Sequence, residues 1–283
     1  MMNTLRTTST LLALTIFVSG CGHRNQELPA ASSDQGNDFE KSVAEYIKGF
    51  PYQDTYNYAM NYTGSDPAKF NTWVLGAEPA LVKAGEDKVV RMNNDTYYKM
   101  AFFLLDQGPV TLGSVNLSKE RFSSFQLMDD HNVNFRNVIH PSGKYTLYHG
   151  QKPDPVQGEA IEAPSSLALV IVRVEVKDKN DVNDVADAKK VFTGITINGP
   201  AIEEFPKLDL LSAFDKNVEM EALKRIDKTF ESTDFSKLIA GPGDVPEKVS
   251  YLELAAGTKG GWGGPVTSHS AYETIFLMAR ARR

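Results

Sequence analysis

The sequence predicts an α+β fold in which an antiparallel, β-rich domain is flanked by helices. Three observations support this prediction. A helical pattern begins at Asp38, short segments rich in Val, Phe and Tyr follow between residues 81 and 148, and helical patterns return after residue 180. Turn residues interrupt the β segments at short, regular intervals, which favours an antiparallel sandwich or barrel over a sheet built from βαβ units.

The first helix is expected over residues 38–50. Apolar residues recur there at three- and four-residue steps and share one face: Phe39, Val43, Tyr46, Ile47 and Phe50. Gly49 followed by Pro51 predicts the end of this helix, because proline cannot continue the hydrogen-bond ladder. A second short helix is expected through Tyr56 and Met60.

Six short segments then have the composition of strands: Lys88–Met92, Tyr97–Leu105, Val110–Leu112, Arg121–Met128, Val133–Ile139 and Tyr145–Tyr148. Side chains alternate between the two faces of a strand. In the fourth segment, Phe125 and Leu127 therefore lie opposite Ser124 and Gln126. One face of this strand should be buried and the other more polar.

The most apolar segment is Ser166–Val176, and its length and β-branched residues predict the middle of a sheet. Arg173 within it needs a partner or an exposed edge, because a buried unpaired charge is very costly. Helical patterns with one apolar side follow. Three further helices are predicted: Asn180–Phe192, Asp215–Ser232 and Ser270–Arg280.

The amino-terminal residues 1–20 have the pattern of a secretory signal. Arg6 precedes a short apolar run, and two small residues stand directly before Cys21. The run is too short to span a bilayer, which takes about 20 apolar residues. Val18-Ser19-Gly20-Cys21 resembles the lipobox of bacterial lipoproteins, which implies a lipid on the cysteine sulfur and cleavage just before it. An ordinary signal peptide with an incidental cysteine is the alternative.

The mature chain is expected to begin with a flexible tether, because residues 21–37 are polar and contain Pro, Ser and Gly. Residues 38–200 should form the β-rich domain, and residues 201–283 a helical extension packed on it. A multiply acylated cysteine holds a protein firmly at a membrane. We therefore expect a cell-envelope protein anchored through Cys21, with its folded part in the periplasm or at the cell surface.

Composition excludes several classes of protein. The chain has 36 Asp+Glu against 30 Lys+Arg and a formal net charge of −6, so it lacks the basic field that binds nucleic acid. A single cysteine cannot form an intramolecular disulfide or a Cys-based zinc site. The sequence has no G-x-S-x-G or H-E-x-x-H motif, and Gly257–Pro265 lacks the ending of a phosphate-binding loop. No cofactor is predicted.

Two polar clusters supply the candidate site residues. The first contains Arg91, Asn93, Asn94, Asp95 and Tyr97. The second contains Gln126, Asp129, Asp130, His131 and Asn132. Each follows or interrupts a predicted strand, where a rigid scaffold commonly carries binding groups. The alternative is that both clusters are turns, because Asn and Asp also hydrogen-bond to their own backbone.

Asp95, Asp129 and His131 are the candidates for acid–base chemistry, since a carboxylate orients an imidazole and raises its basicity. Neighbours along a strand point to opposite faces, so we expect His131 to pair with Asp129, or across strands with Asp95, rather than with Asp130. A metal is not predicted. The weak candidate ligands have a spacing that matches no known motif: Asp129, Asp130, His131, His140 and His149.

Several segments together resemble the bacterial domain-of-unknown-function family twelve-fifty-four: Ala44–Pro51, Phe70-Asn71, Val90–Tyr97, Gln126–Asp129 with Asn132 and Phe135, and Gly143–Tyr145. The resemblance runs from about Ser42 to Phe192. It implies a β-rich, jelly-roll-like domain, often followed by a second β domain of the family twelve-fourteen. It implies no agreed reaction.

The chain ends at Arg283, so the resemblance predicts that the second domain is absent. A site between two such domains would need a separate partner chain, and a second copy of this chain is the other partner to consider. We expect a membrane-anchored lipoprotein that binds a small ligand or a partner subunit through its Asn, Asp and His residues. The alternative is a hydrolase-like enzyme that uses Asp95, Asp129 and His131, with or without a metal.

Overall fold

The computed structural model describes residues 33–82, 93–115, 120–204, 208–232 and 250–258. It confirms the α+β class. The helices are α1 (Ser33–Thr63), α2 (Val182–Thr193), α3 (Lys216–Ser232) and α4 (Tyr251–Thr258). The strands are β1 (Thr96–Leu104), β2 (Val110–Ser114), β3 (Ser123–Met128), β4 (Asn134–Ile139), β5 (Gly143–Tyr148), β6 (Glu159–Glu162), β7 (Leu167–Glu175) and β8 (Thr196–Asn198). Two short 3₁₀ turns cover Pro67–Lys69 and Leu105–Gln107.

The strands form two four-stranded sheets that share one core. The first sheet has the order β1-β7-β3-β4 and is antiparallel throughout. The second has the order β6-β5-β2-β8, in which only the β5–β6 pair is parallel. Strand β7 pairs with β1 on one side and β3 on the other, which confirms the central strand predicted over residues 166–176. The expected strand over residues 88–92 and the helix over 270–280 lie outside the described residues.

The alternation of side chains in β3 is confirmed. Phe125 and Leu127 enter the core between the two sheets, where they meet apolar residues of β2, β5 and β7. Ser124 and Gln126 lie on the opposite face of the strand. Helix α2 closes one end of the core through Phe192, whose ring packs on Tyr97 with 5.5 Å between centroids. Strands β6 and β8 were not predicted, because three or four residues are too few to show a period of two.

Helix α1 is continuous through Pro51, so the predicted break there is wrong. The residues before Pro51, such as Val43 and Ile47, pack on α3 and α4. The residues after it, such as Tyr56 and Ala59, pack on the outer face of the first sheet. A proline inside a helix costs about 3 kcal/mol. Burial of apolar area on both sides of Pro51 offsets this cost, which the sequence pattern of one helix cannot reveal.

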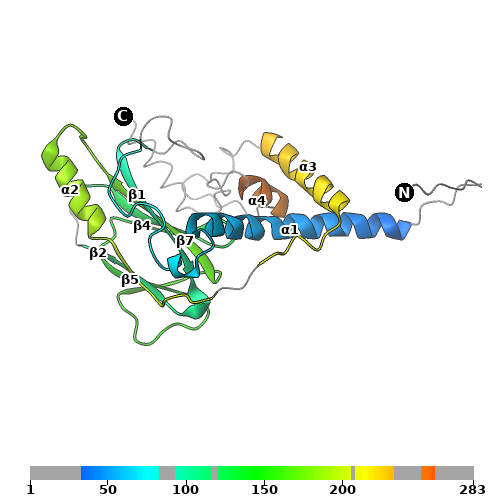
Figure 1. Ribbon diagram of the computed structural model, residues 1–283, viewed down its shortest axis with the longest axis horizontal. Coiled ribbons are helices and arrows are strands. Elements are labelled where there is room, and N and C mark those ends of the chain that lie inside the picture. Colours follow the sequence, from blue (N-terminus) through cyan, green and yellow to red (C-terminus); the bar gives the residue numbers. More distant parts are fainter. Residues whose placement is uncertain (1–32, 83–92, 116–119, 205–207, 233–249, 259–283) are drawn as a thin grey trace, which may run out of the picture.

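Figure 1 shows α1 as a long rod that touches the sheets at one end and carries α3 and α4 along its length. None of the helices in the described ranges has both the length and the apolar character needed to cross a bilayer.

We expect Asn71→Ala to destabilise the fold, because Asn71 joins three segments. Its side chain donates to the carbonyl oxygen of Pro200 at 2.9 Å and accepts from the backbone N–H of Leu104 at 3.2 Å. Its φ of 57° is a conformation that alanine disfavours. The loss of two buried hydrogen bonds should lower the free energy of unfolding by about 2–4 kcal/mol in urea denaturation. The exposed Asn94→Ala is the matched control, and equal stability of the two variants would contradict this account.

Candidate functional site

Asp129 shapes the turn between β3 and β4. Its Oδ1 accepts the backbone N–H groups of His131 at 3.0 Å and Val133 at 2.9 Å. Its backbone oxygen accepts the N–H of Asn132 at 3.0 Å, and Asn132 has a φ of 59°, which asparagine tolerates. These bonds hold residues 129–133 around the Asp129 carboxylate. Asn132, a predicted ligand-binding residue, is buried in this turn and has a structural role there.

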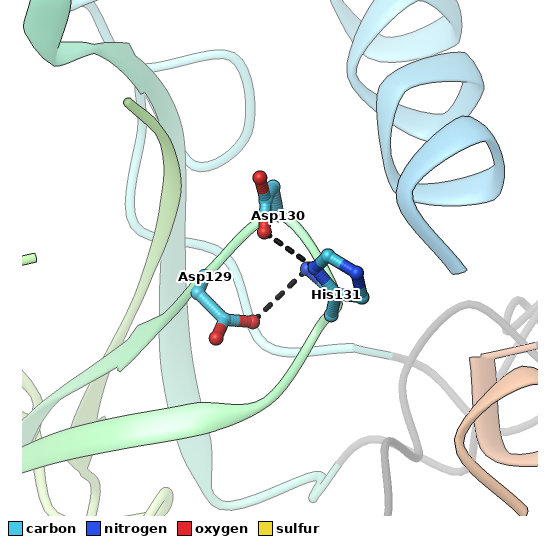
Figure 2. Close-up of side chains that lie close together, drawn as sticks. All are labelled: Asp129, Asp130 and His131. Carbon is cyan, nitrogen blue, oxygen red and sulfur yellow. Dashed lines mark hydrogen bonds and ion pairs between the residues drawn. The ribbon is translucent and has the colours of Figure 1, made fainter. Parts of the chain in front are cut away.

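The imidazole of His131 pairs with Asp130, at 2.6 Å between Nδ1 and Oδ1 (Figure 2). We expected Asp129 or Asp95 as the partner, so this prediction is wrong. The reason is that the three residues lie in a turn, where neighbours need not point to opposite faces as they do in a strand. Asp129 contacts His131 only through the backbone N–H. The His131 side chain stays 32% exposed.

Two segments distant in sequence complete the surroundings of this pair. The His131 ring lies 6.2 Å from the ring of Tyr52 on α1, measured between centroids. The hydroxyl of Ser165 accepts the backbone N–H of Asp130 at 3.0 Å and donates to the carbonyl of Leu167. Neither Tyr52 nor Ser165 was predicted. Tyr52 belongs to a helical pattern and Ser165 to a loop, and no local signal connects either of them with residues 129–132.

The pKa values of two side chains at the turn, Asp129 and His131, are both raised. Burial raises the pKa of the Asp129 carboxyl to about 6. The hydrogen bond that the Asp130 carboxylate accepts from Nδ1 raises the pKa of His131 above its ordinary value, and burial opposes this shift only in part. Both shifts favour the protonated forms: the imidazole keeps its proton to a higher pH than an ordinary histidine does, and the carboxyl loses its proton at a higher pH than an ordinary aspartate does.

Asp129, Asp130 and His131 are also the one group of three acidic or imidazole side chains in the described part of the chain that could hold a metal ion. One ligand atom from each lies within 4.8 Å of the others. The two other histidines proposed as weak ligands do not join them. Nδ1 of His140 bonds the carbonyl of Arg121 at 3.1 Å, and Nδ1 of His149 bonds that of Ala163 at 3.0 Å.

Asp95 lies at the opposite end of the first sheet from His131. It precedes β1, whose first residue pairs with Glu175 of β7, whereas the last residue of β3 pairs with Leu169. At about 3.3 Å per residue, these two levels of β7 are roughly 20 Å apart along the strand. The structure therefore does not bring Asp95 to Asp129 and His131. The Asp95 carboxylate instead accepts the hydroxyl of Thr96 at 3.0 Å.

The other predicted ligand-binding residues separate into different environments. Tyr97 is 2% exposed inside the core between the sheets and cannot face a ligand at the surface. Asn94 is exposed in a turn, and the backbone N–H of Asn93 donates to the hydroxyl of Tyr98 at 3.1 Å. Gln126 bonds the side chain of Arg173 and not the β3–β4 turn. Arg91 lies outside the described residues.

A separate groove of about 1010 Å³ runs between α1 and residues 208–223. Its lining mixes apolar side chains with polar and acidic ones, such as Asn57 and Glu219, and burial raises the pKa of Asp54 within it to about 6. The polar Gln53 on its wall already bonds the backbone of Leu208 and Leu210. None of the predicted site residues that the structure describes lines this groove. Asp129 and His131, the predicted acid–base residues that the structure brings together, lie instead at the β3–β4 turn.

The family assignment rests on a sequence match over residues 74–199 to the family described as "Protein of unknown function (DUF1254)". The chain carries a DUF1254 domain. This confirms the resemblance to family twelve-fifty-four from residue 74 onward, whereas the segments Ala44–Pro51 and Phe70-Asn71 lie before the matched residues. The DUF1254 domain contains all eight strands named above and helix α2. Helix α1 lies before it, and α3 and α4 lie after it.

Two solved structures of bacterial proteins are similar to this chain. The VPA0106 protein from Vibrio parahaemolyticus has a TM-score of 0.49 and 14% sequence identity, covering 87% of this chain and 60% of that one. A putative uncharacterized protein from Burkholderia cenocepacia has a TM-score of 0.32 and 13% identity, covering 64% and 54%. The chain thus spans 60% and 54% of the lengths of these two proteins. No curated protein matches the sequence.

We expect Asp129→Asn to flatten the dependence of stability on pH. The folded-state pKa of about 6 exceeds the ordinary 3.8, so stability from protonated Asp129 is fully present below about pH 3.8 and is lost as pH rises through about 6. This difference corresponds to roughly 3 kcal/mol at most. Asparagine removes the titration, and its amide oxygen can still accept both N–H groups. Urea denaturation between pH 4 and pH 7 measures the effect.

The exposed Asp187→Asn is the control for this experiment and should keep the wild-type profile. His131 also has a raised pKa, so its contribution is lost with rising pH in the same direction and leaves a residual slope in Asp129→Asn. An Asp129→Asn variant whose slope equals that of the wild type would show that Asp129 is not buried as described.

Proposed function

We propose that this chain is a lipid-anchored protein of the bacterial cell envelope whose DUF1254 domain binds a small ligand at the β3–β4 turn. The observation that carries the proposal is the pair of His131 and Asp130, 2.6 Å apart, partly exposed and next to Tyr52. A carboxylate that fixes one ring nitrogen of a histidine sets the orientation of the ring and leaves the other nitrogen for a ligand.

Figure 2 shows how Asp129, Asp130 and His131 lie relative to one another. The His131 ring turns its second nitrogen, Nε2, away from both carboxylates, while Nδ1 faces Asp130. Tyr52 supplies an aromatic surface beside the ring. Two carboxyl groups accompany one imidazole, so the turn favours a cation or a polar ligand with a positive group over an anion. Carboxylate and imidazole together also suit divalent transition metals.

The same contact supports an enzyme-like alternative. A histidine that bonds a carboxylate through Nδ1 can exchange a proton through Nε2, as a general base or acid does. In this version Asp130 orients the imidazole, and Asp129 contributes a nearby carboxyl of raised pKa. Asp95 has no part in it. A hydrolase of this kind would activate water at His131, and a metal held by the same three residues would assist it.

The membrane anchor is supported by the apolar run of the first 20 residues and the small residues before Cys21. These residues lie outside the described ranges. Lipidation contributes about 0.8 kcal/mol for each buried CH₂ group, so several acyl chains hold a protein at a bilayer without a spanning helix.

We expect Cys21→Ser to remove the protein from the membrane fraction. Serine cannot form the thioether to the lipid, so the chain should accumulate as an uncut precursor that does not incorporate labelled palmitate. Cell fractionation and labelling measure both effects. A Cys21→Ser variant that remains in the membrane fraction at its wild-type mass would contradict the anchor.

We expect the mature chain, purified in detergent, to bind one equivalent of Zn²⁺ or Mn²⁺, or to retain a small molecule, at the turn. Native mass spectrometry before and after a chelator identifies both. His131→Ala removes a ligand atom and should weaken metal binding by roughly tenfold or more, or abolish the retained adduct. The exposed His149→Ala is the matched control and should behave as wild type. The absence of any bound species that depends on His131 would refute the proposed site.

A further inference from the structure

Arg173 is a buried cation near the end of the central strand β7. It lies on β7 and is 6% exposed. In the sheet it pairs with Tyr98 of β1 on one side and Ser124 of β3 on the other, so these three side chains share one face. This face is the one turned away from the core between the sheets, because Phe125 and Val172 enter that core. Arg173 therefore belongs to a polar patch on a face whose other buried residues are mostly apolar.

The described residues around Arg173 satisfy its guanidinium only in part. Its Nη1 donates to Oε1 of Gln126 at 2.6 Å, and the guanidinium carbon lies 5.7 Å from the centroid of the Tyr98 ring. The Tyr98 hydroxyl is itself held by the backbone N–H of Asn93 at 3.1 Å. Both partners are neutral. In the described part of the chain, no Asp or Glu lies within ion-pair distance of this arginine.

Two buried donors next to each other lack partners. Nε of Arg173 is fully buried without a hydrogen bond in the described structure, and so is the hydroxyl of Ser124 directly opposite. Buried polar groups in proteins are almost always bonded to protein, water or an ion. Burial of an arginine without an anion is also costly, and it lowers the pKa of Arg173, which Tyr98 opposes. A guanidinium edge and a hydroxyl on one face form the donor set of an anion site.

We propose that Arg173 and Ser124, together with Gln126 and Tyr98, bind the carboxylate or phosphate group of a small ligand on this face of the first sheet. Gln126 holds Nη1, so the side of the guanidinium that carries Nε meets the anion. Ser124 donates a second bond from the neighbouring strand. Tyr98 supports the guanidinium from its ring face.

This anion site is separate from the turn that contains His131. Ser124 and Asp129 are five positions apart along the chain, which at about 3.3 Å per residue is roughly 16 Å. The two places also differ in charge, since Arg173 is the charged residue of one, whereas two acids and an imidazole occupy the other. Failure of one proposal therefore leaves the other standing.

The test uses the mature chain in detergent with sodium phosphate or sodium acetate as the probe, at an ionic strength held constant with sodium chloride. Both anions, or one of them, should raise the Tm of the wild type in a saturable manner. Arg173→Met keeps much of the volume and removes the charge. It should be at least as stable as wild type without anion and should lose roughly tenfold or more in anion affinity, because a charge-assisted hydrogen bond is lost.

Ser124→Ala is the second variant and decides the matter if Arg173→Met does not fold. It should remain folded and bind the anion several-fold more weakly. Arg136→Met is the matched control and should bind as wild type does, because Arg136 is an exposed arginine on β4 of the first sheet, paired with Glu159 on β6 of the second sheet. His131→Ala should leave the affinity unchanged.

The outcomes separate the possible sources of the anion. Saturation by phosphate alone assigns a phosphate-bearing ligand, and saturation by acetate assigns a carboxylate. An equal rise in Tm in wild type and Ser124→Ala would overturn the proposal. The proposal would also be overturned if Arg173→Met folds, is less stable than wild type without anion, and shows the same rise in Tm with anion as wild type. Arg173 would then have a purely structural role.

Discussion

The burial of β7 on both of its faces is the constraint on which the rest of the structure depends. One face of this strand supplies the core between the sheets, and the other faces α1 and the loops that follow it. A strand buried on both sides needs apolar residues at nearly every position, and Leu167–Glu175 has them except at Arg173 and at its end. The sandwich, the docking of α1 and the position of the candidate sites all follow from this one strand.

Both candidate sites include residues of β3, the strand next to β7, or of the turn that follows it. The turn at the end of β3 places acids and an imidazole at the edge of the sandwich, where Tyr52 of α1 reaches them. Ser124 and Gln126 near the beginning of β3 sit beside Arg173. The structure therefore separates the second polar cluster of the sequence. Gln126 lies along the strand beside the cation Arg173, whereas Asp129, Asp130 and His131 lie together in the turn.

The sheet was predictable from the sequence because its information is local. Alternation in residues 121–128 and the apolar run of 166–176 identify β3 and the central β7 without reference to any other segment. The continuation of α1 through Pro51 was not predictable, because it depends on packing against α3, α4 and the first sheet. The pairing of His131 with Asp130 was missed for a related reason. Alternation of side chains holds along a strand, whereas residues 129–132 form a turn whose geometry is set by the hydrogen bonds of Asp129.

Helix α1 also has a mechanical consequence. Its 31 residues at about 1.5 Å each make a rod of roughly 46 Å. One end of this rod is embedded beside Phe102 and Ile171, whereas α3 and α4 brace the portion farther from the sheets. A force applied at the amino end of α1 would act along the helix axis, and it would not separate an edge strand from its sheet. The sandwich could then be displaced or reoriented as a single body while its strands remain paired.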